Sequence, residues 1–183
     1  MAYPGKQIHN PITRQSIQFL KTAQDTGGQL LEMVTTYDSH SAPPSAHYHP
    51  YQEEDFVVLE GQVTVQIGKE NKVLNAGDTL HIPRNTVHAM WNAGDEKAMV
   101  NWQVRPAMDT EYLLETGMGL AAAGKTDQRG RLHRMQAIMT GARFASVYRL
   151  PRPPYWEQLI LFTLIRPIAW LRGFRATYPE YLD

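Results

Sequence analysis

Short β-prone segments alternate with clusters of turn-forming residues from residue 16 to residue 104, and this rhythm restricts the folds open to the chain. Apolar side chains recur at every second position, as at Val63, Val65 and Ile67, which gives a strand one apolar face. Short strands at even spacing with turns between them indicate an antiparallel sandwich or barrel. The expected strands cover residues 16–21, 29–37, 55–59, 62–67, 73–74, 79–82, 87–91 and 97–104.

The connections between these strands carry their own predictions. The turn cluster at 23–28 predicts a hairpin between the first two strands, and Glu60-Gly61 predicts a tight turn that pairs the third strand with the fourth. Residues 1–14 are polar and contain prolines, which predicts an irregular arm. Such an arm stays loose or adds a strand to the sheet edge of a partner.

The pattern becomes helical after Pro106. Asp109 is a candidate N-cap for a helix through Met118, and Gly141 weakens the middle of a second helical segment. We therefore predict two parts, a β-barrel with its N-terminal arm at 1–106 and a helical extension at 107–183. The extension is expected to pack on the barrel or on a partner subunit. The later helical segments are 131–148 and 155–172.

Composition excludes several classes of protein. The chain has no cysteine, so disulfide frameworks, thiolate metal sites and cysteine nucleophiles are ruled out. Its formal net charge is +0, which gives no overall attraction to nucleic acid or to an anionic membrane. Residues 1–10 lack the apolar core of a signal peptide, so we expect a soluble cytoplasmic protein.

Histidines and a carboxylate form the clearest chemical signal. His47 and His49 are one residue apart and would point the same way on an extended strand. Glu54 follows five residues later, and His88 belongs to a later strand. Imidazole and carboxylate together suit divalent Zn, Fe, Ni, Mn or Cu, so we predict one divalent metal ion per chain, of open identity.

These two segments resemble the two motifs of the cupin superfamily. In the first motif, His47, His49, Glu54 and Gly61 stand at the expected spacing, and Ser41 replaces the opening glycine. In the second motif, the glycine, proline, histidine and asparagine positions are occupied, and an asparagine replaces the middle glycine. Those second-motif residues are Gly77, Pro83, Asn85, His88 and Asn92.

The resemblance implies a mainly β fold, a double-stranded β-helix or jelly-roll barrel followed by C-terminal α-helices. The chain is similar to small single-domain cupins, and the resemblance covers residues 12–106. It also implies that four side chains bind one metal inside the barrel, namely His47, His49, Glu54 and His88. Glu53 competes for the carboxylate position, but Glu54 keeps the spacing to Gly61. The alternative is a hydrogen-bonded histidine cluster that holds no metal or only an adventitious ion.

Further side chains are candidates for the pocket wall. Met90 and Trp102 fit barrel-core packing equally well, and His81 is equally consistent with an ordinary polar strand residue. The six candidates are Tyr51, Gln52, Phe56, His81, Met90 and Trp102.

The segment 155–172 is apolar nearly all round and should be buried. It is shorter than the run of about 20 residues that spans a bilayer, and Arg166-Pro167 interrupts it. We favour packing on the barrel or on a partner subunit, with a membrane-surface anchor as the alternative. This helix and the N-terminal arm together predict a homodimer.

These features predict a metal-binding protein that acts on or binds a small organic molecule. Dioxygenase-like chemistry is the leading hypothesis, with Glu54 as a catalytic base, and isomerase or lyase chemistry would use the same residues. The alternative is a non-catalytic protein that binds a sugar, phenolic or carboxylate ligand. No helix-turn-helix with a basic recognition face is evident, so we expect no nucleic-acid partner.

Overall fold

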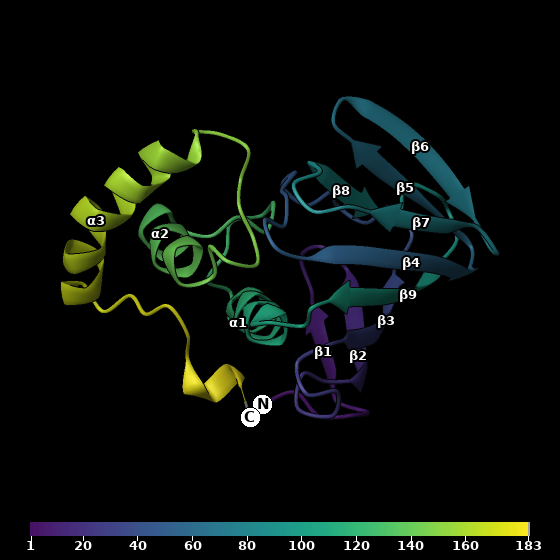
Figure 1. Cartoon of the computed structure of the whole chain (residues 1–183), viewed down its shortest axis with the longest axis horizontal. Helices are drawn as coiled ribbons and strands as arrows, with labels where there is room; N and C mark the ends of the chain where they lie inside the picture. Colours follow the sequence, from purple (N-terminus) through teal and green to yellow (C-terminus); the bar gives the residue numbers. More distant parts are fainter. Residues whose placement is uncertain (183) are drawn as a thin grey trace.

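The computed structural model describes residues 1–182 and contains nine β-strands followed by three α-helices and a short 3₁₀ helix. Figure 1 shows the strands gathered on one side of the molecule and α2 and α3 on the other. The strands are β1 (Gln7–Asn10), β2 (Gln15–Lys21), β3 (Leu31–Tyr37), β4 (Glu53–Glu60), β5 (Gln62–Ile67), β6 (Glu70–Asn75), β7 (Thr79–Ile82), β8 (His88–Trp91) and β9 (Ala98–Arg105). The helices are α1 (Thr110–Ala122), α2 (Arg134–Arg143), α3 (Tyr155–Leu171) and η1 (Pro179–Tyr181).

The strands form two antiparallel sheets. The larger sheet has the order β1-β2-β3-β9-β4-β7, and the smaller has the order β6-β5-β8. The expected mainly β fold, a jelly-roll barrel followed by C-terminal helices, is confirmed. The expected hairpin of β2 and β3 is also present, with Ile17 opposite Thr35.

The connection at Gly61 differs from our expectation. We predicted that the strands on either side would pair, but β4 pairs with β7 and β9, whereas β5 pairs with β6 and β8. Gly61 has φ +68°, and a Cβ atom there would lie 2.3 Å from the carbonyl oxygen of Lys97. The tight turn is therefore a corner at which the chain passes from one sheet into the other, and only glycine fits it.

The N-terminal arm also differs from our expectation of a loose or partner-bound segment. β1 pairs with β2 of the same chain, with Ile8 opposite Ile17, and the Gly5 amide donates to the Phe19 carbonyl at 2.8 Å. Ala2 is buried in the core. Apolar contacts and backbone hydrogen bonds thus fix a segment whose polar composition does not predict a strand.

One face of the larger sheet carries the core. Even-numbered residues of β9 face the core, where Val100 and Val104 are buried and Trp102 is partly buried, and those between them face outward. The smaller sheet covers one half of this face, and α1 covers the other half, where Met118 packs against Phe19 and neighbouring residues. Trp102 contacts both halves of the core.

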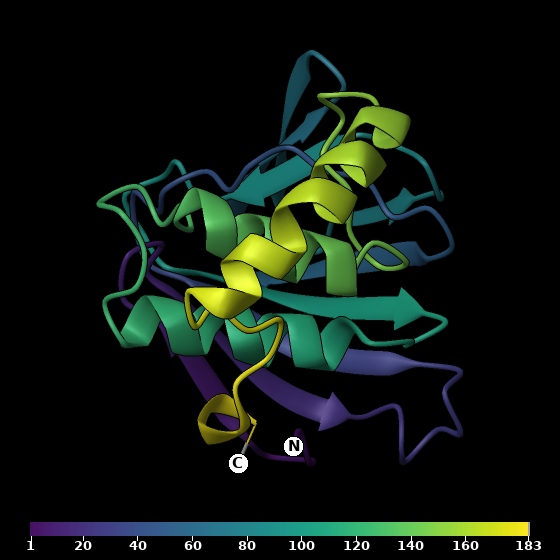
Figure 2. The ribbon, with the colours of Figure 1, turned by 90° about the vertical axis from the view of Figure 1, so that its left-hand side faces the viewer.

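The helices form successive layers away from the barrel. α1 packs against β1, α2 packs against α3, and α3 is the outermost element in Figures 1 and 2. Asp109 precedes α1 as expected, but its side chain pairs with Arg143 at 2.6 Å instead of capping the helix. Within residues 1–182, no helix is both long enough and apolar enough to cross a membrane.

Within this single chain, α3 is buried on one side only, so packing on a partner subunit stays a prediction. Its inner side faces α2, but Trp156, Leu164 and Leu171 on its outer side are 63%, 64% and 76% exposed. A single helix of 10 residues, α2, is too small to cover a helix of 17 residues.

Candidate metal centre

The segment that carries the first two histidines is held on both sides by isolated β-bridges. His47 exchanges backbone hydrogen bonds with His88 at 3.0 and 2.8 Å, and Tyr48 does the same with Arg149 at 2.9 and 3.0 Å. We expected an extended segment here; Pro50 follows immediately, and the pairing is limited to these bridges. The backbone is nevertheless extended between two anchors, which fixes where His47 and His49 can point.

Three histidines meet at one place in the barrel. One nitrogen atom from each of His47, His49 and His88 lies within 4.8 Å of the other two. His49 and His88 are buried, and His47 is half-buried. Side chains from two segments about forty residues apart in the sequence thus converge, as the metal-site prediction requires.

Backbone carbonyls fix the orientation of all three rings. The Nδ1 atom of His47 lies 3.0 Å from the Ser45 carbonyl, and that of His88 lies 2.9 Å from the Thr86 carbonyl. His49 Nδ1 makes a short contact with the Val147 carbonyl. A carbonyl oxygen can only accept, so each Nδ1 carries the hydrogen and donates it. The lone pair of each neutral ring is then on Nε2, the atom left to bind a metal.

Glu54 supplies a negative charge beside two of the histidines. Its Oε2 lies 2.9 Å from His88 Nε2 and 3.2 Å from His49 Nε2, and the residue is 1% exposed. Its Oε1 accepts a hydrogen bond of 2.9 Å from Trp102 Nε1. Glu54 and Phe56 on β4 lie opposite Val104 and Trp102 on β9, so strand register places the indole diagonally across from the carboxylate.

Two buried atoms of this cluster lack a hydrogen-bond partner among the described residues, namely His49 Nε2 and Glu54 Oε2. They face one another at 3.2 Å, and a neutral Nε2 and a carboxylate both offer only lone pairs. A cation bound between them would satisfy both atoms. Three imidazoles and one carboxylate are also a donor set that divalent transition metals accept, so these residues fit a metal ion.

Burial and neighbouring charges set the protonation of the cluster. Desolvation, assisted by His88 and His49, lowers the pKa of His47 to about 3. Desolvation would raise the pKa of Glu54, but His49 and His88 outweigh it and hold that pKa well below its usual range. Desolvation would lower the pKa of His49, whereas the Glu54 carboxylate raises it above its usual value. The site therefore combines an ionised Glu54 with a His47 that stays neutral at ordinary pH.

The structure brings three of the six predicted pocket residues close to the cluster or into the core around it. Trp102 contacts Glu54 directly, and its ring stacks on Phe56 with centroids 5.9 Å apart. Phe56 and Met90 belong to the hydrophobic core between the two sheets.

The other three candidates point elsewhere. Tyr51 is 55% exposed, and His81 pairs with Asp55 at 2.8 Å on the outer face of the sheet. Gln52 is buried, but its amide donates to the carbonyls of Pro106 and Ala107 and to the Thr110 hydroxyl, which fastens β4 to the start of α1. Glu53, the rival to Glu54, pairs with Arg84 and faces outward.

The helical extension contributes contacts that the sequence did not reveal. Val147 accepts the His49 hydrogen bond through its carbonyl, and the Tyr148 ring stacks on His47 with centroids 4.6 Å apart. Desolvation raises the pKa of Tyr148 to about 12, so its hydroxyl stays neutral. These residues belong to the segment between α2 and α3, which we call the roof segment (residues 147–149). Any residue type can accept through its backbone carbonyl, so the sequence does not reveal this contact. For this part of the chain the sequence predicts only a helical segment at 131–148.

The remaining motif positions serve turn geometry. Asn85, which replaces a glycine, adopts φ +63°, a conformation that asparagine tolerates. Ser41, which replaces the other glycine, accepts a hydrogen bond from the Asn92 amide at 2.8 Å. Asn92 is buried, and its side chain closes the turn before β9 by donating to the Glu96 carbonyl.

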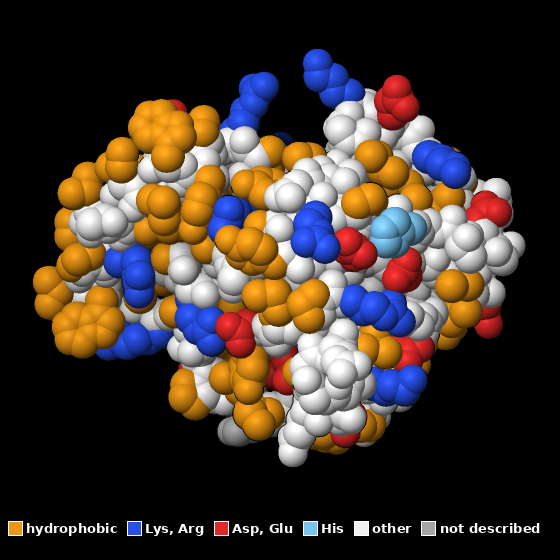
Figure 3. Space-filling view, in the orientation of Figure 1, with side chains coloured by type: hydrophobic (Ala, Val, Ile, Leu, Met, Phe, Trp, Pro, Cys, Tyr) orange, Lys and Arg blue, Asp and Glu red, His pale blue; other side chains and the backbone are white. Residues whose placement is uncertain are grey.

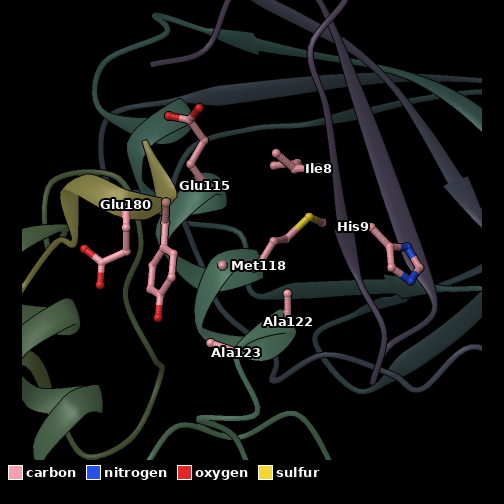
Figure 4. A pocket seen from close by; sticks show the side chains of 9 residues that line it. Ile8, His9, Glu115, Met118, Ala122, Ala123 and Glu180 are labelled. Carbon is pink, nitrogen blue, oxygen red and sulfur yellow. The ribbon is translucent and has the colours of Figure 1, made fainter. Parts of the chain in front are cut away.

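A separate hollow lies between β1, α1 and η1. It has a volume of about 300 Å³, and Figure 4 shows Ile8 and His9 on one side and Met118 on α1. The three clustered histidines do not line it. This hollow is therefore distinct from the space into which the histidine Nε2 atoms point.

Comparison with known proteins identifies the β-barrel. Residues 33–104 match the family described as Cupin domain. The matching relatives include quercetin 2,3-dioxygenase of Bacillus subtilis (strain 168), 35% identical over 85 residues, which are 46% of this chain and 23% of that protein. They also include polyketide synthase CurC of Streptomyces cyaneus, 40% identical over 62 residues, which are 34% of this chain and 40% of that protein. The chain thus spans well under half of either relative.

Among solved structures, an RmlC-like cupin from Shewanella frigidimarina is 19% identical, with a TM-score of 0.49 over 61% of this chain and 94% of that one.

Proposed function

Since this chain belongs to the cupin superfamily, we propose that it holds one divalent metal ion and uses it to act on or bind a small organic molecule. The proposed ligands are His47, His49, Glu54 and His88. One observation carries the proposal: each histidine is turned by a backbone carbonyl so that its Nε2 faces the same space, beside a buried carboxylate oxygen that lacks a partner among residues 1–182.

A metal with this donor set offers one or two open positions for water, dioxygen or a substrate atom. The residues around these open positions determine which groups can approach the metal. Glu54 is ionised and accepts a hydrogen bond from the Trp102 N–H, so its main proposed role is that of an anionic ligand. A role for Glu54 as proton acceptor would require the carboxylate to leave the metal, because a bound divalent cation would lower its basicity further.

Dioxygenase-like chemistry on a phenolic or diketone substrate is our leading proposal for the activity. The partial similarity to quercetin 2,3-dioxygenase supports it, although that relative extends far beyond the matched region. Non-catalytic binding of a sugar, phenolic or carboxylate stays the alternative. A cytoplasmic location and a homodimer also stay predictions, and the homodimer loses one support because the N-terminal arm pairs within its own chain.

Metal content tests the ligand set. We expect about one equivalent of metal per chain by elemental analysis, and we expect the double variant His49→Ala/His88→Ala to lose it. His81→Ala is the matched control, because His81 lies on the outer face and should not affect metal content. A double variant that stays folded and keeps its metal would refute the assignment.

Oxygen uptake separates enzyme from binding protein. The metal-loaded chain would be assayed with quercetin, simple phenols and β-diketones, followed by calorimetric titration of the same compounds. Uptake that requires both substrate and metal supports the dioxygenase. Binding without uptake favours the non-catalytic alternative.

A further inference from the structure

The inner side of α3 is fully used by packing within the chain. Gln158 and Ala169 are buried, and Phe162 and Ile165 are partly buried on the same side. The Gln158 amide donates to the carbonyls of Leu150 and Pro153 at 2.9 and 2.7 Å. These positions are three or four residues apart, as expected for one face of a helix. α3 is thus held firmly and has only its outer side to offer.

The outer side of α3 is an exposed apolar surface. At 100° per residue, Trp156, Ile160, Leu164 and Leu171 lie nearly opposite the packed side. They are 63%, 50%, 64% and 76% exposed. In Figure 3 hydrophobic side chains crowd the edge of the molecule formed by α3. A continuous apolar surface of this kind on a soluble domain marks an interaction site.

The same part of the chain is strongly basic. Residues 123–176 contain ten Lys and Arg residues and two Asp and Glu residues, although the whole chain has formal net charge +0. Of these ten cations, only Arg131 and Arg143 form salt bridges within residues 1–182. The excess positive charge therefore remains available to an external anionic partner.

Basic and aromatic side chains frame the apolar surface. Arg166 in α3 and Arg172, which caps its C-terminal end, are both exposed, and the Arg172 guanidinium lies beside Met135 of α2. Trp156 and Trp170 are near the two ends of the helix, and fourteen residues is just under four turns, so they lie on similar sides. The Arg175 guanidinium lies 5.2 Å from the centre of the Trp170 ring. Apolar residues in the middle, with tryptophan and arginine at the margins, suit the boundary between lipid chains and anionic headgroups.

We propose that α3 docks on the surface of an anionic phospholipid bilayer, with its outer side among the lipid chains and its arginines at the phosphates. α3 lies in the plane of the membrane because its inner side stays packed on α2. This proposal departs from our sequence-based expectation that α3 is covered by the barrel or by a second copy.

Charge argues against a second copy as the occupant of this surface. Pairing two α3 helices would bring Arg166 and Arg172 of both chains together, and Glu157 is the one acidic residue in the helix. Like charges at close range oppose association, whereas an anionic bilayer neutralises them.

Vesicle binding by the full-length chain tests the proposal. We expect co-sedimentation with phosphatidylcholine vesicles that contain phosphatidylglycerol, at least about tenfold stronger than with phosphatidylcholine alone, and weakened by salt. Trp156 and Trp170 should shift their emission to shorter wavelength on binding, and the double variant Trp156→Phe/Trp170→Phe should lose that shift. None of these measurements requires a bound metal, so metal-free protein should also bind the anionic vesicles.

Matched variants separate the apolar and basic contributions. Ile160→Ser/Leu164→Ser should abolish binding, whereas Val73→Ser, at an exposed apolar site on β6, should not. Arg166→Gln/Arg172→Gln should weaken binding to anionic vesicles, whereas Lys69→Gln/Lys72→Gln should not. Circular dichroism would establish that each variant is folded. Failure of the intact chain to bind anionic vesicles overturns the proposal, and so does a dimer that Ile160→Ser/Leu164→Ser converts to monomer without any vesicle binding.

Discussion

Each histidine of the cluster donates its Nδ1–H to an uncharged carbonyl, so Glu54 is the one negative charge in contact with the imidazoles among the described residues. A divalent ion held by three neutral rings and one carboxylate would keep a net charge of about +1. Such a centre attracts an anionic second ligand more strongly than a neutral one. This favours substrates that ionise, such as phenols, diketones or carboxylates.

Trp102→Phe tests the hydrogen bond to Glu54. The ring stays available to stack on Phe56, but a buried carboxylate oxygen loses its donor. We expect a loss of about 1–3 kcal/mol in unfolding free energy and about 10–100-fold in metal affinity. Chemical unfolding and competition with a chelator measure the two. Trp91→Phe is the control, and equal effects of the two substitutions would contradict the role given to Trp102.

Metal affinity should fall as the pH falls. In the metal-free protein Glu54 raises the pKa of His49, and a proton on Nε2 must leave before that atom can bind metal. Affinity should be greatest above this raised pKa and should drop about tenfold per pH unit below it. His47, with a pKa of about 3, stays neutral over this range. Zn²⁺ titrations at stepped pH measure the trend, and Glu54→Gln should move it to lower pH. A flat profile would exclude proton competition at His49.

The candidate site was predictable from sequence only as far as side chains carry it. The spacing of His47, His49, Glu54 and His88 predicted a cluster, and the structure brings them together. Their roles as ligands stay a prediction. The Val147 carbonyl could not be predicted, because every residue has a carbonyl and its position depends on how the extension folds back.

At the scale of elements, strand existence was easier to predict than strand pairing. Alternation identified β5, because one buried face leaves a period of two in the sequence. Alternation does not say which strand lies alongside, so it cannot distinguish a hairpin turn at Gly61 from the corner between sheets that is present there. β1 was missed because its four residues are too short and polar to show a period.

Gly61→Ala tests the corner. The new Cβ would meet the Lys97 carbonyl oxygen at 2.3 Å in a backbone conformation with φ +68°, so the junction of β4 and β5 must shift. We expect a loss of about 2–4 kcal/mol in unfolding free energy, measured by urea denaturation. Gly68→Ala shares the positive φ but has open space around it, and should cost about 1 kcal/mol. Similar losses at both positions would mean that the close contact is unimportant.

At the scale of the whole molecule, the helical extension and the barrel meet at the candidate site. The roof segment pairs with Tyr48, covers His47 with Tyr148 and holds His49 through Val147. The division of the chain into two parts at residue 106 stays a prediction. The barrel without the extension would lack these contacts at the candidate site. Composition could not reveal this, since the two parts differ in secondary structure but share one site.

Tyr148→Ala should loosen the site without removing a proposed ligand. Loss of the ring that stacks on His47 admits water and frees that imidazole. We expect release of metal to a chelator to become about tenfold faster, with the fold retained by circular dichroism. Tyr3→Ala, an exposed tyrosine at the other end of the chain, is the control. Unchanged release from Tyr148→Ala would show that the roof segment does not retain the ion.

Only a short, proline-bearing stretch connects the Val147 carbonyl to the first turn of α3, and the Arg149 guanidinium lies 3.6 Å from the centre of the Tyr155 ring. Prolines stiffen such a linker, so a displacement of α3 would be transmitted to His49. The coupling between two binding sites is reciprocal. If contact with lipid alters how strongly the ion is retained, loading the ion must alter the preference for lipid by the same factor.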